Sequence, residues 1–151
     1  MKAITPFLWF DDDLDEAIDF YTSVFPDGKV HGTTRMHDGK VVGADFELAG
    51  QRVKGLNGGP MFPHTEAFSF LVECEGQDEV DRYWQALTAD GGEESMCGWL
   101  KDRFGLSWQI IPVEFLDMVA DGSPDQVQRV MAAMQTMRKM DVAALQAAYA
   151  G

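Results

Sequence analysis

Two stretches of this sequence carry the same pattern 63 residues apart: FLWFDDDLDEAIDFYTSVFPDG at 7–28 and FLVECEGQDEVDRYWQALTADG at 70–91. Both begin with Phe-Leu, share a glutamate and two adjacent aromatic residues at matching positions, and end in Asp-Gly. Each copy predicts an apolar strand, an acidic turn and an amphipathic helix that stops at a glycine. Two copies with so long a period indicate one fold used twice rather than a solenoid. We therefore expect a pseudo-symmetric protein whose function lies in the cavity between the copies.

The sequence around the first copy predicts a complete β-α-β-β-β module at residues 1–59. Its first strand is expected at 4–10, with apolar residues on both faces, and three more strands are expected at 29–36, 41–48 and 52–56. Asp38-Gly39 and Ala49-Gly50 are the expected turns between them. Gly58-Gly59-Pro60 closes the module, and residues 60–66 read as a linker.

The second module, at residues 67–113, shows three of the four strands directly. They are expected at 67–74, 95–100 and 106–112, with a helix at 77–88, and the fourth strand is assigned by symmetry. A helical tail follows at 123–150, where Ser123 and Pro124 form a helix start and Asp141 starts a second short helix. The predicted fold is α+β: one domain over residues 1–151, with paired modules building a curved, mainly antiparallel sheet of eight strands.

Four methionines recur every third residue in the tail, at positions 131, 134, 137 and 140. Methionine at helical spacing usually fills an apolar core. We expect this stripe to pack against the outside of the sheet or against a partner subunit.

Composition excludes several function classes. The chain has 151 residues and a formal net charge of −13, which argues against binding to nucleic acid or to an anionic membrane. The apolar stretch at the N-terminus is too short for a signal sequence or a membrane span, so we expect a cytoplasmic protein. Two cysteines are too few for a disulfide framework and lack the spacing of a zinc site.

Several motifs resemble those of one known family. The paired modules, the DFY triplet at 19–21 and a last strand entered through Asp102 and Gly105 resemble the vicinal oxygen chelate superfamily, which includes glyoxalase I, bleomycin-resistance proteins and extradiol dioxygenases. The stretches FELAGQ (46–51), LNGGP (56–60), QDEVDRYW (77–84) and CGWLKDRFGLSWQ (97–109) are similar to its PhnB-like branch, which carries the label 3-demethylubiquinone-9 3-methyltransferase. The resemblance implies a glyoxalase-like fold and a homodimer.

The resemblance also implies a metal site, whose four ligand positions can be carried over one at a time. They fall on Pro6, Lys54, Ser69 (or Ala67, if the strand slips by two residues) and Gln109. Proline and alanine cannot bind a metal ion, and a lysine ammonium repels one. We therefore predict that this chain has lost the metal site and needs no cofactor.

Other candidate centres have weaker support. We expect His31, His37 and His64 in loops or at strand ends, where they make no metal site, although His64 with Glu66 stays a minor alternative. Cys97 could face either the cavity or the core, and a redox or nucleophilic role for it stays open. Neither Gly58-Gly59 nor Gly91-Gly92 leads into a helix, so no S-adenosylmethionine motif supports the methyltransferase label.

What remains is a pocket with many aromatic residues on the strands. We predict ligand-binding roles for Leu8, Asn57, Ser69, Trp99 and Gln109, with Trp108 facing the helices, and we assign no catalytic residue. The sequence therefore predicts a metal-independent protein that binds a small, partly aromatic molecule. The alternative is an enzyme of unknown reaction that acts on a quinone- or phosphonate-like substrate, as the family labels suggest.

Overall fold

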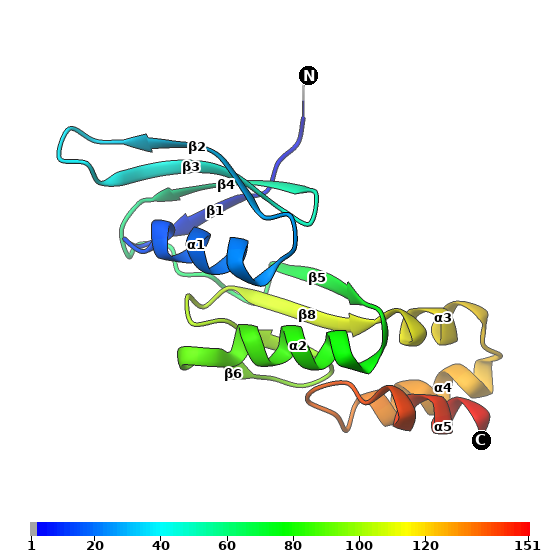
Figure 1. Cartoon of the computed structure of the whole chain (residues 1–151). Helices are drawn as coiled ribbons and strands as arrows, with labels where there is room; N and C mark the ends of the chain where they lie inside the picture. The colour runs from blue at the N-terminus through cyan, green and yellow to red at the C-terminus, as the bar shows by residue number, and fades with distance from the viewer. Residues whose placement is uncertain (1–2) are drawn as a thin grey trace. The chain divides into compact units, whose positions relative to one another are not determined.

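The computed structural model describes residues 3–151, and its contacts divide the chain into two compact units. The first unit runs up to His64, and the second extends from Thr65 to Gly151. This division falls within the predicted linker at 60–66. Each unit contains its own four-stranded sheet with a helix against one face (Figure 1).

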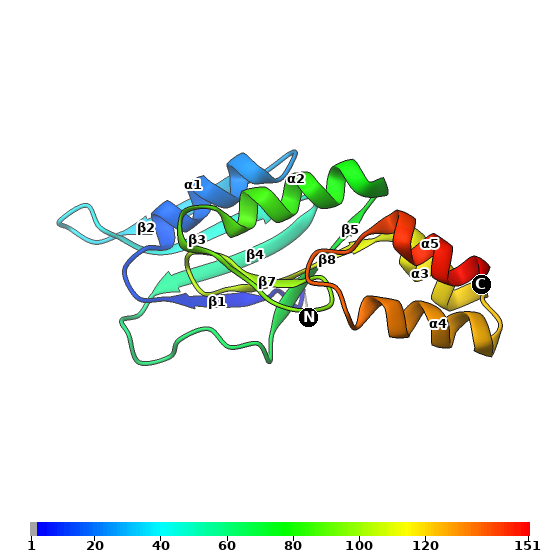
Figure 2. The same cartoon turned by 90° about the horizontal axis from the view of Figure 1, so that it is seen from below.

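The first unit is a β-α-β-β-β module with one mixed sheet in the order β1-β4-β3-β2. Strands β1 and β4 run parallel, and the other two neighbouring pairs are antiparallel. Helix α1 is the single helix among the described residues of this unit, and it lies against one face of the sheet (Figures 1 and 2). The elements are β1 (Phe7–Phe10), α1 (Leu14–Val24), β2 (Lys29–Arg35), β3 (Val41–Leu48) and β4 (Gln51–Asn57).

Burial alternates along the strands and shows which side chains face α1. On β3, Ala44, Phe46 and Leu48 are buried, whereas Asp45 and Glu47 between them are partly exposed. Because successive side chains of a strand point to opposite faces, the first three pack under α1. The last two belong to the opposite face, which we call the open face of the first sheet.

The second unit repeats this arrangement with a sheet in the order β5-β8-β7-β6. Strands β5 and β8 are parallel, and β7 is antiparallel to both β8 and β6. Helix α2 covers one face, since Trp84 of α2 donates from Nε1 to Glu94 of β6 at 2.7 Å. The elements are β5 (Ser69–Cys74), α2 (Gly76–Thr88), the 3-10 turn η1 (Ala89–Gly91), β6 (Glu93–Glu94), β7 (Trp99–Lys101) and β8 (Ser107–Pro112).

Three helices follow β8 and build a separate apolar cluster of the second unit: α3 (Val113–Asp121), α4 (Pro124–Met134) and α5 (Val142–Ala150). Helices α4 and α5 lie side by side in both views (Figures 1 and 2). The cluster joins Ile111 at the end of β8 to Val130, Met134, Met140 and Leu145, with Met131 and Met137 packed around it. The methionine stripe is therefore core packing within the second unit.

The predicted fold class is confirmed: the protein is α+β, with two similar modules and eight strands among residues 3–151. Strand β3 has the predicted bounds. At the predicted turn, Ala49 and Gly50 both have positive φ, at 44° and 83°, as a two-residue hairpin loop requires. Ser123 and Gln126 form a reciprocal capping box at α4, and the Asp141 side chain accepts from the Ala144 amide at the start of α5.

The eight described strands form two mixed sheets, each with one parallel and two antiparallel pairs. Three details of the predicted elements are wrong. The strand expected at 95–100 starts only at Trp99, because Cys97 and Gly98 both have positive φ and leave the extended region. Helix α3 was not anticipated at all. His31 lies inside β2 rather than in a loop or at a strand end.

Candidate functional site

In each unit, the parallel pair of strands brings together two of the four carried-over metal-ligand positions. The Lys54 amide donates to the carbonyl oxygen of Pro6 at 3.0 Å in the first unit. In the second, Gln109 Nε2 donates to Ser69 Oγ at 2.9 Å. Ser69, the direct carry-over rather than Ala67, lies within β5.

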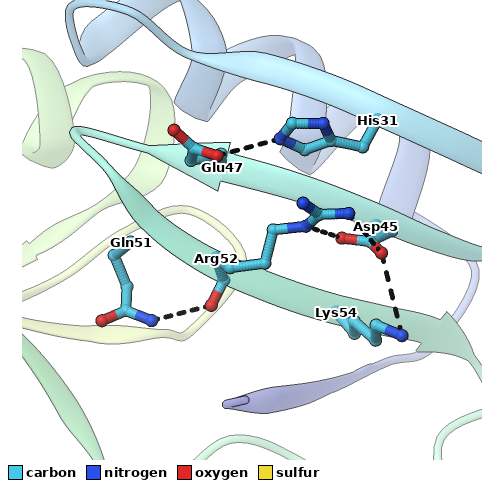
Figure 3. Close-up of polar contacts among 6 residues, drawn as sticks. All are labelled: His31, Asp45, Glu47, Gln51, Arg52 and Lys54. Carbon is cyan, nitrogen blue, oxygen red and sulfur yellow. Dashed lines mark hydrogen bonds and ion pairs between the residues drawn. The ribbon is translucent and has the colours of Figure 1, made fainter. Parts of the chain in front are cut away.

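The open face of the first sheet carries an array of charged side chains (Figure 3). Arg52 donates from both Nε and Nη2 to the carboxylate of Asp45, and Lys54 Nζ lies 3.7 Å from Asp45 Oδ2. His31 Nε2 lies 2.9 Å from Glu47 Oε2. The hydrogen bond from Arg52 is the main cause that lowers the pKa of Asp45 below its ordinary value. Asp45 is therefore the anionic centre that holds both cations.

Leu8 does not face a cavity, and that prediction is wrong. Its side chain is only 4 % exposed, and it lies opposite Gly55 in the parallel register. A Cβ built on Gly55 would come within 2.8 Å of Leu14 Cδ1 on α1, so this row of the sheet is the one that α1 covers. Leu8 belongs to the core under α1, and Phe7, which is 59 % exposed, is its neighbour on the open face.

Asn57 links three elements of the first unit. Its Oδ1 accepts from the amide of Leu14 at 3.0 Å, and its Nδ2 donates to the carbonyl oxygen of Val41 at 3.0 Å. It thus caps helix α1, whose own N-cap residue Asp13 makes no side-chain cap bond. The structure gives Asn57 a structural task; its ligand-binding role stays a prediction.

The open face of the second sheet carries most of the remaining predicted residues. Trp108 and Ile110 are buried, at 2 % and 0 % exposure, and Trp108 shares its row with Leu100 and Glu94 on the α2 face. Trp108 therefore faces the helix as predicted, with Nε1 donating to Asp102 Oδ2 at 2.8 Å. By alternation along the strands, the open face receives Ser69, Leu71, Trp99, Lys101, Ser107 and Gln109.

A cavity of about 490 Å³ lies at this open face, within the usual size range of small-molecule sites. Apolar groups of Met96, Cys97 and Trp99 line it, together with Ser107 and Lys101. Glu66 accepts from Lys101 Nζ at 2.5 Å; this hydrogen bond is the main cause that lowers the pKa of Glu66 and raises that of Lys101. Of the residues expected to bind a ligand, the structure places Trp99 in this cavity.

Ser107 was missed by the sequence analysis, and its hydroxyl is a buried polar group of this cavity. Its side chain is 1 % exposed, and its Oγ has no hydrogen-bond partner among the described residues. Buried polar atoms are hydrogen-bonded in the great majority of cases. A serine in a strand gives no such signal in the sequence; only its burial and its empty hydrogen-bonding capacity mark it.

The two cysteines occupy different environments. Burial raises the pKa of the Cys74 thiol to about 12, so this thiol stays protonated and unreactive at neutral pH. Cys97 both lines the cavity and packs against the apolar cluster of Met134 and Met140. A redox or nucleophilic role of Cys97 stays a prediction.

The residues at the carried-over ligand positions do not fit a divalent metal. Lys54 brings a positive charge that Asp45 already compensates, and Gln109 uses its amide nitrogen to donate to Ser69. Elsewhere in residues 3–151, no group of three or more His, Cys, Asp and Glu residues is placed to hold a metal ion. His64 lies against the ring of Phe10, with centroids 5.0 Å apart, and Glu66 is engaged by Lys101.

The family model described as 3-demethylubiquinone-9 3-methyltransferase matches residues 2–111. The chain belongs to this family. It is 32 % identical to a PhnB protein from Bacillus cereus with the same label; the match has a TM-score of 0.68 and covers 74 % of this chain and 99 % of the other. Both findings place the protein in the PhnB-like branch of the vicinal oxygen chelate, or glyoxalase, superfamily, as the resemblance implied.

More distant structures share the fold. A protein from Pseudomonas aeruginosa is 19 % identical with a TM-score of 0.61, over 74 % of this chain and 98 % of its own. The fosfomycin resistance protein FosX from Listeria monocytogenes, whose structure contains Mn(II) and sulfate, is 16 % identical with a TM-score of 0.54, over 72 % of this chain and 89 % of its own. Among curated proteins, none matches the chain. No helix within residues 3–151 is long and apolar enough to cross a membrane.

Proposed function

We propose that this PhnB-like protein binds a small, partly aromatic molecule without a metal ion, in the cavity at the open face of the second sheet. The observation that carries the proposal is the cavity itself, where Trp99 and Met96 offer apolar surface beside the Ser107 hydroxyl, which has no hydrogen-bond partner within residues 3–151. Apolar walls with a few polar groups are typical of small-molecule sites.

The side chains at the two carried-over positions of the second unit support a metal-independent mode of binding. The Gln109 amide is oriented by Ser69. Gln109 lies opposite Trp99 in the register of β7 and β8, so its amide borders the same face as the indole. In this proposal Trp99 provides the stacking surface, and Gln109 and Ser69 provide polar contacts at its edge.

The alternative function, an enzyme acting on a quinone- or phosphonate-like substrate, rests on family labels. A thermal-shift screen with small aromatic molecules, run with a chelator and again with Mn²⁺ or Zn²⁺, discriminates between the two. At ten times its Kd, a ligand stabilises the folded state by about 1.4 kcal/mol, or roughly 4 °C for a chain of this size. We expect this shift in the presence of the chelator. A shift that appears only with metal favours the enzyme.

A variant pair assigns the site. Trp99→Ala should abolish the ligand-induced shift, because the indole forms a wall of the cavity. Trp9→Ala is the control: it removes the same side chain from the first unit, where Nε1 of Trp9 donates to the carbonyl oxygen of Gly59. Equal loss in both variants would place the ligand elsewhere and contradict the proposal.

A further inference from the structure

The polar groups of the second-unit cavity differ in how fully they are already paired. Row by row across the sheet, Glu93, Lys101, Ser107 and Ser69 lie opposite one another on β6, β7, β8 and β5. Lys101 is hydrogen-bonded to Glu66, and Glu93 adds a second negative charge near it. Ser69 accepts from Gln109. Ser107, in the middle of this row, is the member whose side chain is buried without a hydrogen-bond partner among the described residues.

The charges around Ser107 disfavour a charged ligand group at its hydroxyl. An ammonium placed there would lie beside the ammonium of Lys101, which is the register neighbour of Ser107. A carboxylate would have to displace Glu66 from Lys101 and would lie near Glu93 and Glu94, which also line the cavity or its rim. Glu94 is held by Trp84 and by Arg138 at 3.6 Å. An uncharged group meets neither penalty.

The missing partner of the Ser107 hydroxyl matters because this hydroxyl is buried. A buried polar atom without a partner loses its hydration and gains nothing in return, whereas a ligand oxygen would restore the hydrogen bond. A hydroxyl can both donate and accept, so a ligand hydroxyl or carbonyl oxygen would satisfy it. Trp99 lies two residues before Lys101, the register neighbour of Ser107, and on the same face of the sheet. Its indole offers an aromatic surface next to the hydroxyl.

We infer that Ser107 is the polar anchor of this cavity and that the ligand is an uncharged aromatic molecule bearing a hydroxyl or carbonyl oxygen. The inference rests on the proposed function and names the ligand class and the residue that recognises it. Neither the family description nor the resemblance assigns a role to Ser107.

Four probes of similar size test the ligand class: 2-phenylethanol, ethylbenzene, phenethylamine and phenylacetate. Each is titrated into the ¹⁵N-labelled full chain, and the amide signals of residues lining the cavity report binding. We expect 2-phenylethanol to bind more tightly than the two charged probes. Tighter binding of phenethylamine or phenylacetate overturns the inference.

Ser107→Ala tests the anchor. The variant should bind 2-phenylethanol about five- to tenfold more weakly, the usual effect of losing one hydrogen bond. Its affinity for ethylbenzene should be unchanged. Ser95→Ala, which removes a hydroxyl from an exposed lining residue, should change neither. If Ser107→Ala loses affinity equally for both probes, or loses none for 2-phenylethanol, Ser107 is not the anchor. The proposed binding function is unaffected by either result. If none of the four probes binds the wild-type cavity, the proposed function fails as well.

Discussion

At the scale of single residues, the open faces of the two sheets differ in how their polar side chains are paired. In the first unit, Asp45 holds both Arg52 and Lys54, so the position that the resemblance assigns to a metal ligand is tied into an ion-pair array. In the second unit, Gln109 is tied to Ser69, whereas Ser107 stays without a partner among the described residues. In the proposed function, this asymmetry favours the second unit as the place where the ligand binds.

Asn57 provides a prediction at this scale. Replacing Asn57 with Ala should lower the free energy of unfolding by about 1–3 kcal/mol, because it leaves the Leu14 amide and the Val41 carbonyl without their side-chain partner. Asn57→Asp keeps the acceptor for Leu14 and should cost less. Urea denaturation measures both. If both variants are as stable as the wild type, the side chain is not the cap of α1.

At the scale of elements, the methionines after the second module connect sequence pattern to packing. Met134 is the last residue of α4, whereas Met137 and Met140 lie in the connection to α5. The three-residue spacing of the methionines therefore continues beyond the end of the helix. All three still contact one cluster, because the chain folds back through hydrogen bonds from the Cys97 and Gly98 amides to the carbonyl oxygens of Met137 and Arg138. The connection is thereby fixed to the entrance of β7.

Met140→Ala should therefore destabilise the protein by about 2–5 kcal/mol, the cost of emptying a core site, since Met140 is only 1 % exposed. Met36→Ala is the matched control, because Met36 is 62 % exposed and its loss should cost less than about 0.5 kcal/mol. Thermal or urea unfolding of the two variants provides the comparison. Similar losses would show that Met140 is not part of the core.

At the scale of the whole molecule, the resemblance predicts a homodimer with an isologous interface. The edge strand β2 is compatible with this proposal, because all seven of its residues are exposed and its outer edge pairs with no described strand. We expect light scattering at micromolar concentration to report twice the chain mass of 16.8 kDa. A monomer under these conditions removes the proposal. The cytoplasmic location likewise remains a prediction.

The sequence by itself determined the duplication, the order of most elements and the family. These features are local or repeated: the hairpin at Ala49-Gly50, the capping box at Ser123 and the paired aromatics of α1 and α2 follow from spacings within a few residues. The four carried-over positions also came from the sequence, because they occupy fixed places within each module.

Only the tertiary structure decided which face a side chain joins and which hydrogen bonds it makes. Leu8 lies in a strand with apolar residues on both sides, so alternation could not place it, and the contact of its row with α1 did. Strand β6 has two residues, too few for any pattern, and exists through its pairing with β7. Helix α3 directly follows the apolar strand β8, so no polar break separates the two in the sequence. The Ser107 hydroxyl is buried without a partner among the described residues, and burial is a property of the packed sheet and not of the residue.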